Sequence, residues 1–226
     1  MNILRANVFR KIARTEACLF VVMLPVPVTA AVMQSRFSLF SAFMLPGAAL
    51  VTTLRLLLII SLANQVAEAA SASQHCYHAK NWCLMQCVTE AIALMLNVIM
   101  TVLNKAEGDS QRTHLLLLTF FYLAYLLILQ LFDYLAKRHL LRGFGEIWQV
   151  CGGDAAQSRQ LRLTHILLVL SCILFLLLIA VFAMMPDSWK AIRILAAGTC
   201  FLVLLVQLRM TRHAYKTAHL LAELSE

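Results

Sequence analysis

Residues 163–185 read LTHILLVLSCILFLLLIAVFAMM, a run of 23 positions without a single Asp, Glu, Lys or Arg. A helix needs about 20 predominantly apolar residues to cross the hydrocarbon core of a bilayer. This run is therefore long enough to span a membrane. It predicts a helix, because backbone groups in hydrocarbon must form their hydrogen bonds within their own segment.

The rest of the chain repeats this pattern. The 226-residue sequence is 62% hydrophobic and only 13% charged, whereas a soluble domain carries about 25% charged residues. No block alternates polar and apolar residues as the strands of a membrane barrel do. We therefore predict an all-α fold: a single integral membrane domain over 1–226, forming a polytopic bundle of about six transmembrane helices. The predicted spans are 17–34, 38–63, 82–103, 114–136, 163–185 and 191–208.

The basic residues predict the orientation of this bundle. If the amino terminus is cytoplasmic, thirteen basic residues fall on the cytoplasmic side and five on the other. Such an asymmetry is typical of cytoplasmic loops, so we expect both termini in the cytoplasm of a bacterium and the chain in its inner membrane. The net charge of +8 is then explained by contacts with anionic lipid, and we expect no nucleic-acid partner.

The first apolar block has a second interpretation. Residues 1–31 combine a basic start, the apolar run CLFVVML, and small residues at Val28 and Ala30. A secretory signal peptide has the same features, and its cleavage would leave five spans. Because the apolar sequence continues through Val32 and Met33, we expect the segment to be retained.

Three cytoplasmic segments, 1–14, 137–162 and 209–226, are predicted to form amphipathic helices at the membrane interface. In the longest, apolar residues recur at spacings of three and four, and Gly152-Gly153 should end the helix. Each segment could dock a partner, although surface-lying connectors are the simpler interpretation. The apolar residues of the longest segment are Leu140, Leu141, Phe144, Ile147 and Trp148.

The stretch HCYHAKNWCLMQC, residues 75–87, raises the question of a metal or thiol site. His75 and His78 precede Cys83 and Cys87, which lie one helical turn apart, so the four side chains could surround a zinc ion. The spacing lacks the paired Cys-x2-Cys of familiar zinc sites, and cysteine is a common small apolar residue in helices. We expect ordinary packing and keep zinc as the alternative. Disulfides are disfavoured on the reducing side of the membrane.

A polar stripe follows the third block, and it predicts an ion pair. Glu90 and Asn97 share a helix face, which must point at protein or water because lipid would leave these groups unpaired. Arg55 and Glu90 each lie about 12 Å into the membrane on neighbouring antiparallel helices. We predict that they pair, and that Gln130 and Asp133 extend this polar network. Alternatively, Arg55 reaches alone toward the headgroups and Glu90 is protonated.

No motif of a nucleophilic hydrolase, a zinc protease or a phosphate loop occurs in the sequence. We therefore expect a protein that is not an enzyme and that binds another integral membrane protein or a second copy of itself. Accessory subunits of secretion or conjugation machines and immunity or entry-exclusion proteins resemble it in size and in lacking catalytic motifs. The alternative is a small transporter or channel with Arg55, Glu90 and Asn97 along its path. A zinc-binding membrane enzyme or sensor is a third interpretation.

Overall fold

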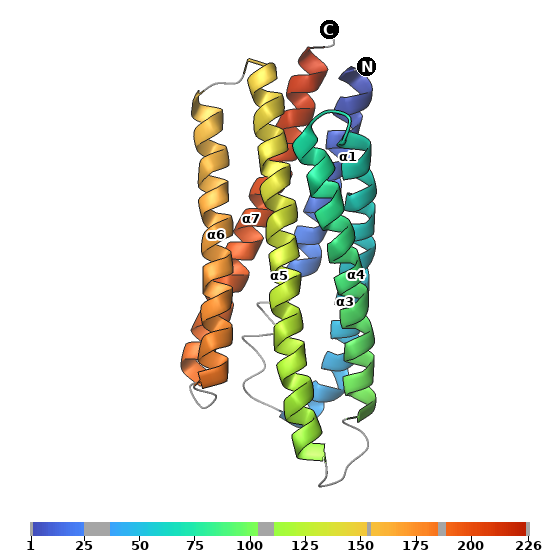
Figure 1. The fold of residues 1–226 in the computed structure, drawn as a ribbon, viewed down its shortest axis with the longest axis vertical. Coiled ribbons are helices and arrows are strands. Elements are labelled where there is room, and N and C mark those ends of the chain that lie inside the picture. Colours follow the sequence, from blue (N-terminus) through green and yellow to red (C-terminus); the bar gives the residue numbers. More distant parts are fainter. Residues whose placement is uncertain (1, 25–36, 104–110, 153–154, 185–188, 225–226) are drawn as a thin grey trace.

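In the computed structural model the described residues form six helices and no strand (Figure 1). The structure describes residues 2–24, 37–103, 111–152, 155–184 and 189–224, and within them the side chains of 37–49, 96–103, 111–123 and 189–193, among a few others, lie outside the description. The predicted all-α fold is confirmed. The helices are α1 (Asn2–Met23), α3 (Phe37–Ala69), α4 (Gln74–Leu103), α5 (Gln111–Val150), α6 (Ala155–Met184) and α7 (Trp189–Glu223).

Three helices, not the six predicted, are long and apolar enough over their described residues to cross a membrane. The three stretches are Leu50–Ala69, Gln157–Val181 and Ile194–Glu223. The predicted spans 17–34, 82–103 and 114–136 run into residues or side chains outside the description. The described part of α1 also carries the basic amino-terminal residues and Glu16, which interrupt its apolar sequence. Three such helices indicate a membrane protein.

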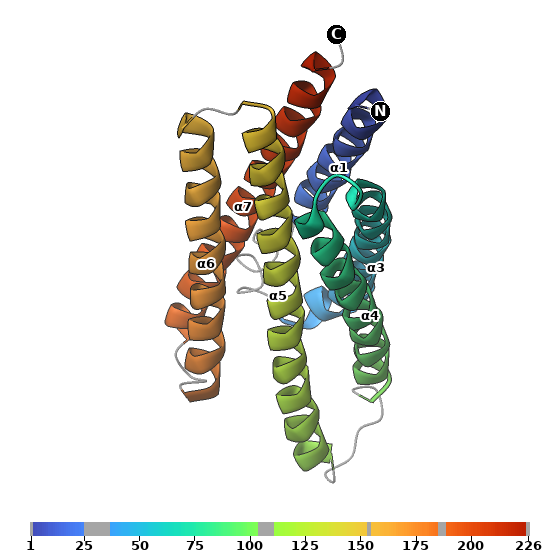
Figure 2. The same ribbon diagram turned by 45° about the horizontal axis from the view of Figure 1, so that its top comes forward.

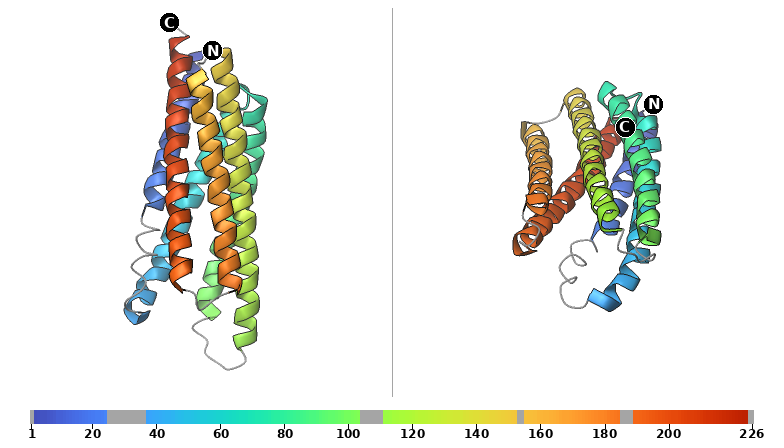
Figure 3. Two further views of the ribbon diagram at one scale, coloured as in Figure 1. Left: turned by 90° about the vertical axis from the view of Figure 1, so that its left-hand side faces the viewer. Right: turned by 60° about the horizontal axis from the view of Figure 1, so that its bottom comes forward.

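The six helices follow one another around a ring. Each helix from α1 to α6 packs against the next helix in the chain, and α7 closes the ring by packing along α1. Figure 2 shows α7 slanting behind α5, so that it meets α6 near one end and α1 near the other. The helices run up and down in turn (Figure 3), which brings both chain termini to the same end of the bundle (Figure 1).

The best-packed part of the described core lies toward the end of the bundle that holds the termini. Phe9 and Ile12 of α1, Val66 of α3 and Phe144 of α5 are fully buried there. The rings of Phe9 and Phe144 meet edge to face, with centroids 6.0 Å apart. This core therefore joins α1, α3 and α5 at this end of the bundle.

The three segments predicted to lie on the membrane surface belong to long helices: residues 2–14 begin α1, 137–150 end α5, 155–162 begin α6, and 209–223 end α7. Helix α5 runs unbroken to Val150 and buries its apolar residues from Leu140 to Trp148 inside the bundle. Trp148 Nε1 donates a hydrogen bond to Thr217 Oγ1 of α7 at 2.8 Å. The membrane-surface position predicted for the apolar face from Leu140 to Trp148 is thus wrong, because that face is buried in the bundle. The interfacial positions of 1–14 and 209–226 stay predictions. An apolar stripe has the same spacing whether it faces lipid or protein, and here α1 and α7 cover it.

Local chemistry explains two of the helix ends. Ser73 caps α4, because its Oγ accepts a hydrogen bond from the backbone N–H of His75 at 3.1 Å, a role that serine serves well. Helix α5 ends at Val150, and Gly152 adopts a φ of 77° directly after it. Glycine enters this left-handed region at little cost, so the predicted end of the helix at Gly152 is confirmed.

Candidate functional site

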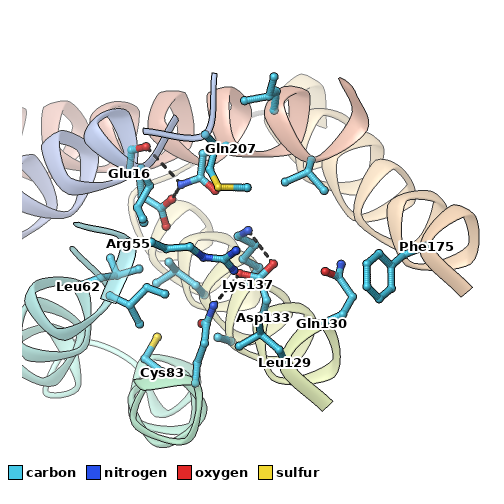
Figure 4. A pocket seen from close by; sticks show the side chains of 18 of the residues that line it. Glu16, Arg55, Leu62, Cys83, Leu129, Gln130, Asp133, Lys137, Phe175 and Gln207 are labelled. Atoms are coloured by element: carbon cyan, nitrogen blue, oxygen red, sulfur yellow. Dashed lines mark hydrogen bonds and ion pairs between the residues drawn. The ribbon is translucent and has the colours of Figure 1, made fainter. Parts of the chain in front are cut away.

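A cavity of about 180 Å³ lies inside the ring and is lined by residues of all six helices. Figure 4 shows charged and amide side chains reaching into it from opposite sides. Apolar residues such as Leu62, Leu129 and Phe175 form much of the remaining wall. The ionisable and other polar side chains that line it are Glu16, Arg55, Cys83, Gln86, Gln130, Asp133, Lys137, Thr199, Cys200 and Gln207.

Arg55 joins α3 to α4 at the edge of this cavity. Its Nε lies 2.8 Å from Glu90 Oε1, which is the pair that the sequence predicted. The Glu90 side chain is 3% exposed and that of Arg55 is 24% exposed. A carboxylate so deeply buried needs a partner, and Arg55 supplies the opposite charge.

Asp133 forms a second pair within α5. Lys137 Nζ donates to Asp133 Oδ2 at 2.7 Å, one helical turn away. Gln86 Nε2 of α4 donates to the other carboxylate oxygen, Oδ1, at 3.1 Å. Gln130 also lines the cavity and donates a weak hydrogen bond to Cys172 Sγ of α6 at 3.7 Å. The predicted Gln130 and Asp133 thus belong to the same polar site as Arg55.

Glu16 is the carboxyl group of this site that forms no ion pair within the described residues. Gln207 Nε2 donates to Glu16 Oε2 and, at 3.2 Å, to the Glu16 backbone carbonyl. Glu16 Oε1 is buried and has no hydrogen-bond partner among the described residues. Glu16 lies just before the predicted span 17–34 and lines the same cavity as Arg55.

The charges of the site can be assigned in pairs. Arg55 faces Glu90 and Lys137 faces Asp133, so each cation already has a carboxylate. Glu16 remains as a third acidic group with only an amide as its partner. When ionised it leaves one uncompensated negative charge inside the bundle, and a low-dielectric interior strongly disfavours such a charge.

Two further sets of predicted site residues remain: Asn97 and the four predicted zinc ligands. Asn97 lies on α4, but its side chain is outside the described part of the chain. The His75 and His78 rings flank His139 of α5, with centroid distances of 5.6 and 5.4 Å, whereas Cys83 faces the cavity.

The predicted zinc ligands therefore do not gather into one set. Within the described ranges, no three His, Cys, Asp or Glu side chains are grouped to hold a metal ion. Next to His75, burial raises the pKa of the Cys76 thiol to about 11, so this thiol stays protonated and is a poor ligand. The cysteines of the described residues are free thiols.

Sequence reasoning missed Glu16, Lys137 and Gln207. Glu16 precedes an apolar block by one position and resembles an ordinary membrane-edge residue, and Lys137 was counted only as a determinant of topology. The signal that could have identified Glu16 is its place in the stripe Phe9, Ile12 and Glu16, which shares a helix face with the core.

The fold and the site together define a class: a helical membrane protein with a charged cavity inside its bundle. Searches against protein families, curated proteins and solved structures found no match for this chain.

Proposed function

We propose that this chain is a multi-pass protein of a bacterial inner membrane that exchanges a proton for a small monovalent cation at Glu16, inside its central cavity. One observation carries the proposal. Glu16 Oε1 is buried at the cavity and lacks a hydrogen-bond partner among the described residues. A buried carboxylate in that condition is stabilised by binding either a proton or a cation.

The charge and the donor atoms of the cavity favour a monovalent cation. The one carboxylate without a cation carries a single negative charge, which one positive charge neutralises. Hard cations prefer oxygen ligands, and Thr199, Gln130 and Gln207 line the same cavity as Glu16. The volume of about 180 Å³ has room for an ion with several waters, since each water occupies about 30 Å³ in the liquid.

This proposal reverses the order of preference that the sequence suggested. Transport was the weaker interpretation there, because the predicted spans contain few acidic residues. The structure brings Glu16 and Asp133 to one cavity and Glu90 to its edge. A proton or ion path needs such a cluster of acidic groups at membrane depth. In this proposal the protein has no enzymatic activity.

The proposed topology has six spans and two cytoplasmic termini. It is supported by the six helices and by the position of both termini at one end of the bundle (Figure 1). Basic residues are concentrated in the segments at that end, which favours a cytoplasmic position for that end of the bundle. Phe9 and Ile12 of α1 are fully buried in the core, which supports retention of the first helix.

Flux measurements in proteoliposomes test the proposed function. A pH gradient should drive uptake of a monovalent cation such as Na⁺ or K⁺ into vesicles that contain the wild-type protein. Glu16→Gln should lose this uptake, because the amide can neither release a proton nor carry a negative charge. Glu68→Gln is the matched control, since Glu68 is exposed and forms a surface ion pair with Lys11. Equal uptake by wild type and Glu16→Gln would contradict the proposal.

A second candidate function is binding to another integral membrane protein. Helix α6 supports it through apolar side chains that no described residue covers. Its apolar side chains Ile166 and Leu176 are 60% and 54% exposed, so lipid or another helix covers them. Photocrosslinking from Leu176 in native membranes should then capture one defined membrane protein or a second copy of this chain. Crosslinks to lipid alone would exclude this candidate.

A further inference from the structure

A second cavity, of about 540 Å³, lies between α5 and α6 near the start of α4. It is separate from the central cavity and shares no lining residue with it. Arg138 and Arg142 line it from successive turns of α5, and Arg162 lines it from α6. His75 and His165 complete its basic wall. Three arginines around one cavity form a strongly positive surface.

The acidic residue of this cavity does not neutralise the arginines. Glu146 accepts a hydrogen bond from Ser73 Oγ and lies 3.5 Å from His75 Nε2. Arg138 packs over the ring of Tyr134, and its Nε is buried without a hydrogen-bond partner among the described residues. An arginine N–H in this condition requires an acceptor, so the cavity favours an anion.

The start of α6 adds to this preference. Helix α6 begins at Ala155, and Gln157 and Ser158 of its first turn line the same cavity. The helix dipole makes such an end attractive to anions. Arginine in turn binds phosphate through two parallel hydrogen bonds. The donors of α5 and α6 therefore converge on one space from two sides.

We infer that this cavity binds the phosphate of an anionic phospholipid headgroup. Arg162 directly precedes the apolar run 163–185, so in the proposed topology the cavity lies at the level of the cytoplasmic headgroups. Basic pockets between helices on this side of a membrane suit anionic headgroups. The volume of about 540 Å³ exceeds what a bare phosphate fills and leaves space for the glycerol that carries it. Leu141 and Leu161 provide an apolar part of the wall.

Lipid binding to the purified full-length chain tests the inference. The protein in neutral detergent is titrated with short-chain phosphatidylglycerol, with phosphatidylcholine of equal chain length, and with inorganic phosphate, while its thermal unfolding is followed. We expect phosphatidylglycerol to raise the unfolding temperature more than phosphatidylcholine, which has the same phosphate but also carries a choline cation that the arginines repel. Salt should weaken the effect, since exposed charges such as Arg142 are screened. Equal effects of the two lipids would overturn the inference.

Variants of the arginines test whether the lipid binds in this cavity. The double variant Arg138→Gln, Arg142→Gln and the single variant Arg162→Gln should each bind phosphatidylglycerol about tenfold more weakly or worse. Arg159→Gln is the matched control, because Arg159 is an exposed arginine on α6 outside the lining of the cavity. If the double variant does not fold, the affinity of Arg162→Gln for phosphatidylglycerol still tests the site.

The affinities of the variants and the titration with inorganic phosphate can also overturn the inference or reassign the ligand. Unchanged affinity in the double variant or in Arg162→Gln would overturn the site. Protection by inorganic phosphate that is as strong as that by phosphatidylglycerol, and that is lost in Arg162→Gln, would retain the phosphate site but assign it to a soluble ligand instead of a lipid. These readouts do not depend on cation flux, so they stand apart from the test of the central cavity.

Discussion

Replacing Arg55 with Leu should destabilise the bundle in a pH-dependent way. The change leaves Glu90, which is 3% exposed and lies 2.8 Å from the Arg55 Nε, without a positive partner at that position. Removing one member of a buried pair costs about 3–5 kcal/mol. Glu90 can limit this cost by taking up a proton. Neutralising a carboxyl of ordinary pKa at pH 7 costs about 4 kcal/mol, and at pH 5 about 1 kcal/mol.

The sign of the pH dependence follows from the proton balance. In the Arg55→Leu variant the folded chain holds a proton on Glu90 that the unfolded chain releases above the ordinary pKa of a carboxyl. The folded state then binds more protons, so its stability falls as the pH rises. We expect a loss of about 4 kcal/mol at pH 7 that shrinks to about 1 kcal/mol at pH 5.

Reversible unfolding in mixed micelles of detergent and SDS measures these free energies. The double variant Arg55→Leu, Glu90→Leu removes both charges and should recover part of the loss, with a coupling energy of about 2–3 kcal/mol. The exposed Lys11–Glu68 pair, at 3.5 Å, is the control, and its loss should cost less than about 1 kcal/mol. Additive effects of the two changes, or a cost independent of pH, would refute the pairing argument.

Three other changes test the packing of the described core. Gly143→Ala places a Cβ 2.8 Å from Cys76 Sγ, where α4 meets α5. We expect this variant to lose about 1–3 kcal/mol of unfolding free energy in the same assay. Full stability of the variant would argue against this close approach. Thr217→Val removes the acceptor of the Trp148 indole N–H and should cost about 1–3 kcal/mol, with a shift in Trp fluorescence. Gly152→Ala strains a residue with a φ of 77° and should cost about 1 kcal/mol; no cost would show that this φ is not required.

Much of the fold could be predicted because lipid imposes simple rules. Long apolar runs such as 163–185 must be helical, and each predicted span falls on a helix where the chain is described. The Arg55–Glu90 pair followed from equal depth on two antiparallel neighbours, an argument that needs only the rise per residue. An argument from the helix rise per residue cannot predict contacts between helices that are far apart in the sequence.

Glu16 illustrates the limit. Its partner Gln207 lies 191 positions away, and only the closing of the ring by α1 and α7 brings the two together.

The segment from Leu140 to Trp148 illustrates a second limit. Its amphipathic spacing indicates that one face is covered, but the same spacing fits a lipid surface and the α1–α7 surface equally well. Which of them covers it is decided by tertiary packing.

The exchange of a proton for a cation at Glu16 can be measured directly. Purified wild-type protein is placed in weak buffer at neutral pH, and K⁺ or Na⁺ is added while a pH-sensitive dye reports released protons. The wild-type protein should release protons in a saturable manner, at most one per chain, and Glu68→Gln should do the same. Glu16→Gln should release none. Equal release by wild type and Glu16→Gln, or no release by wild type, would contradict the account.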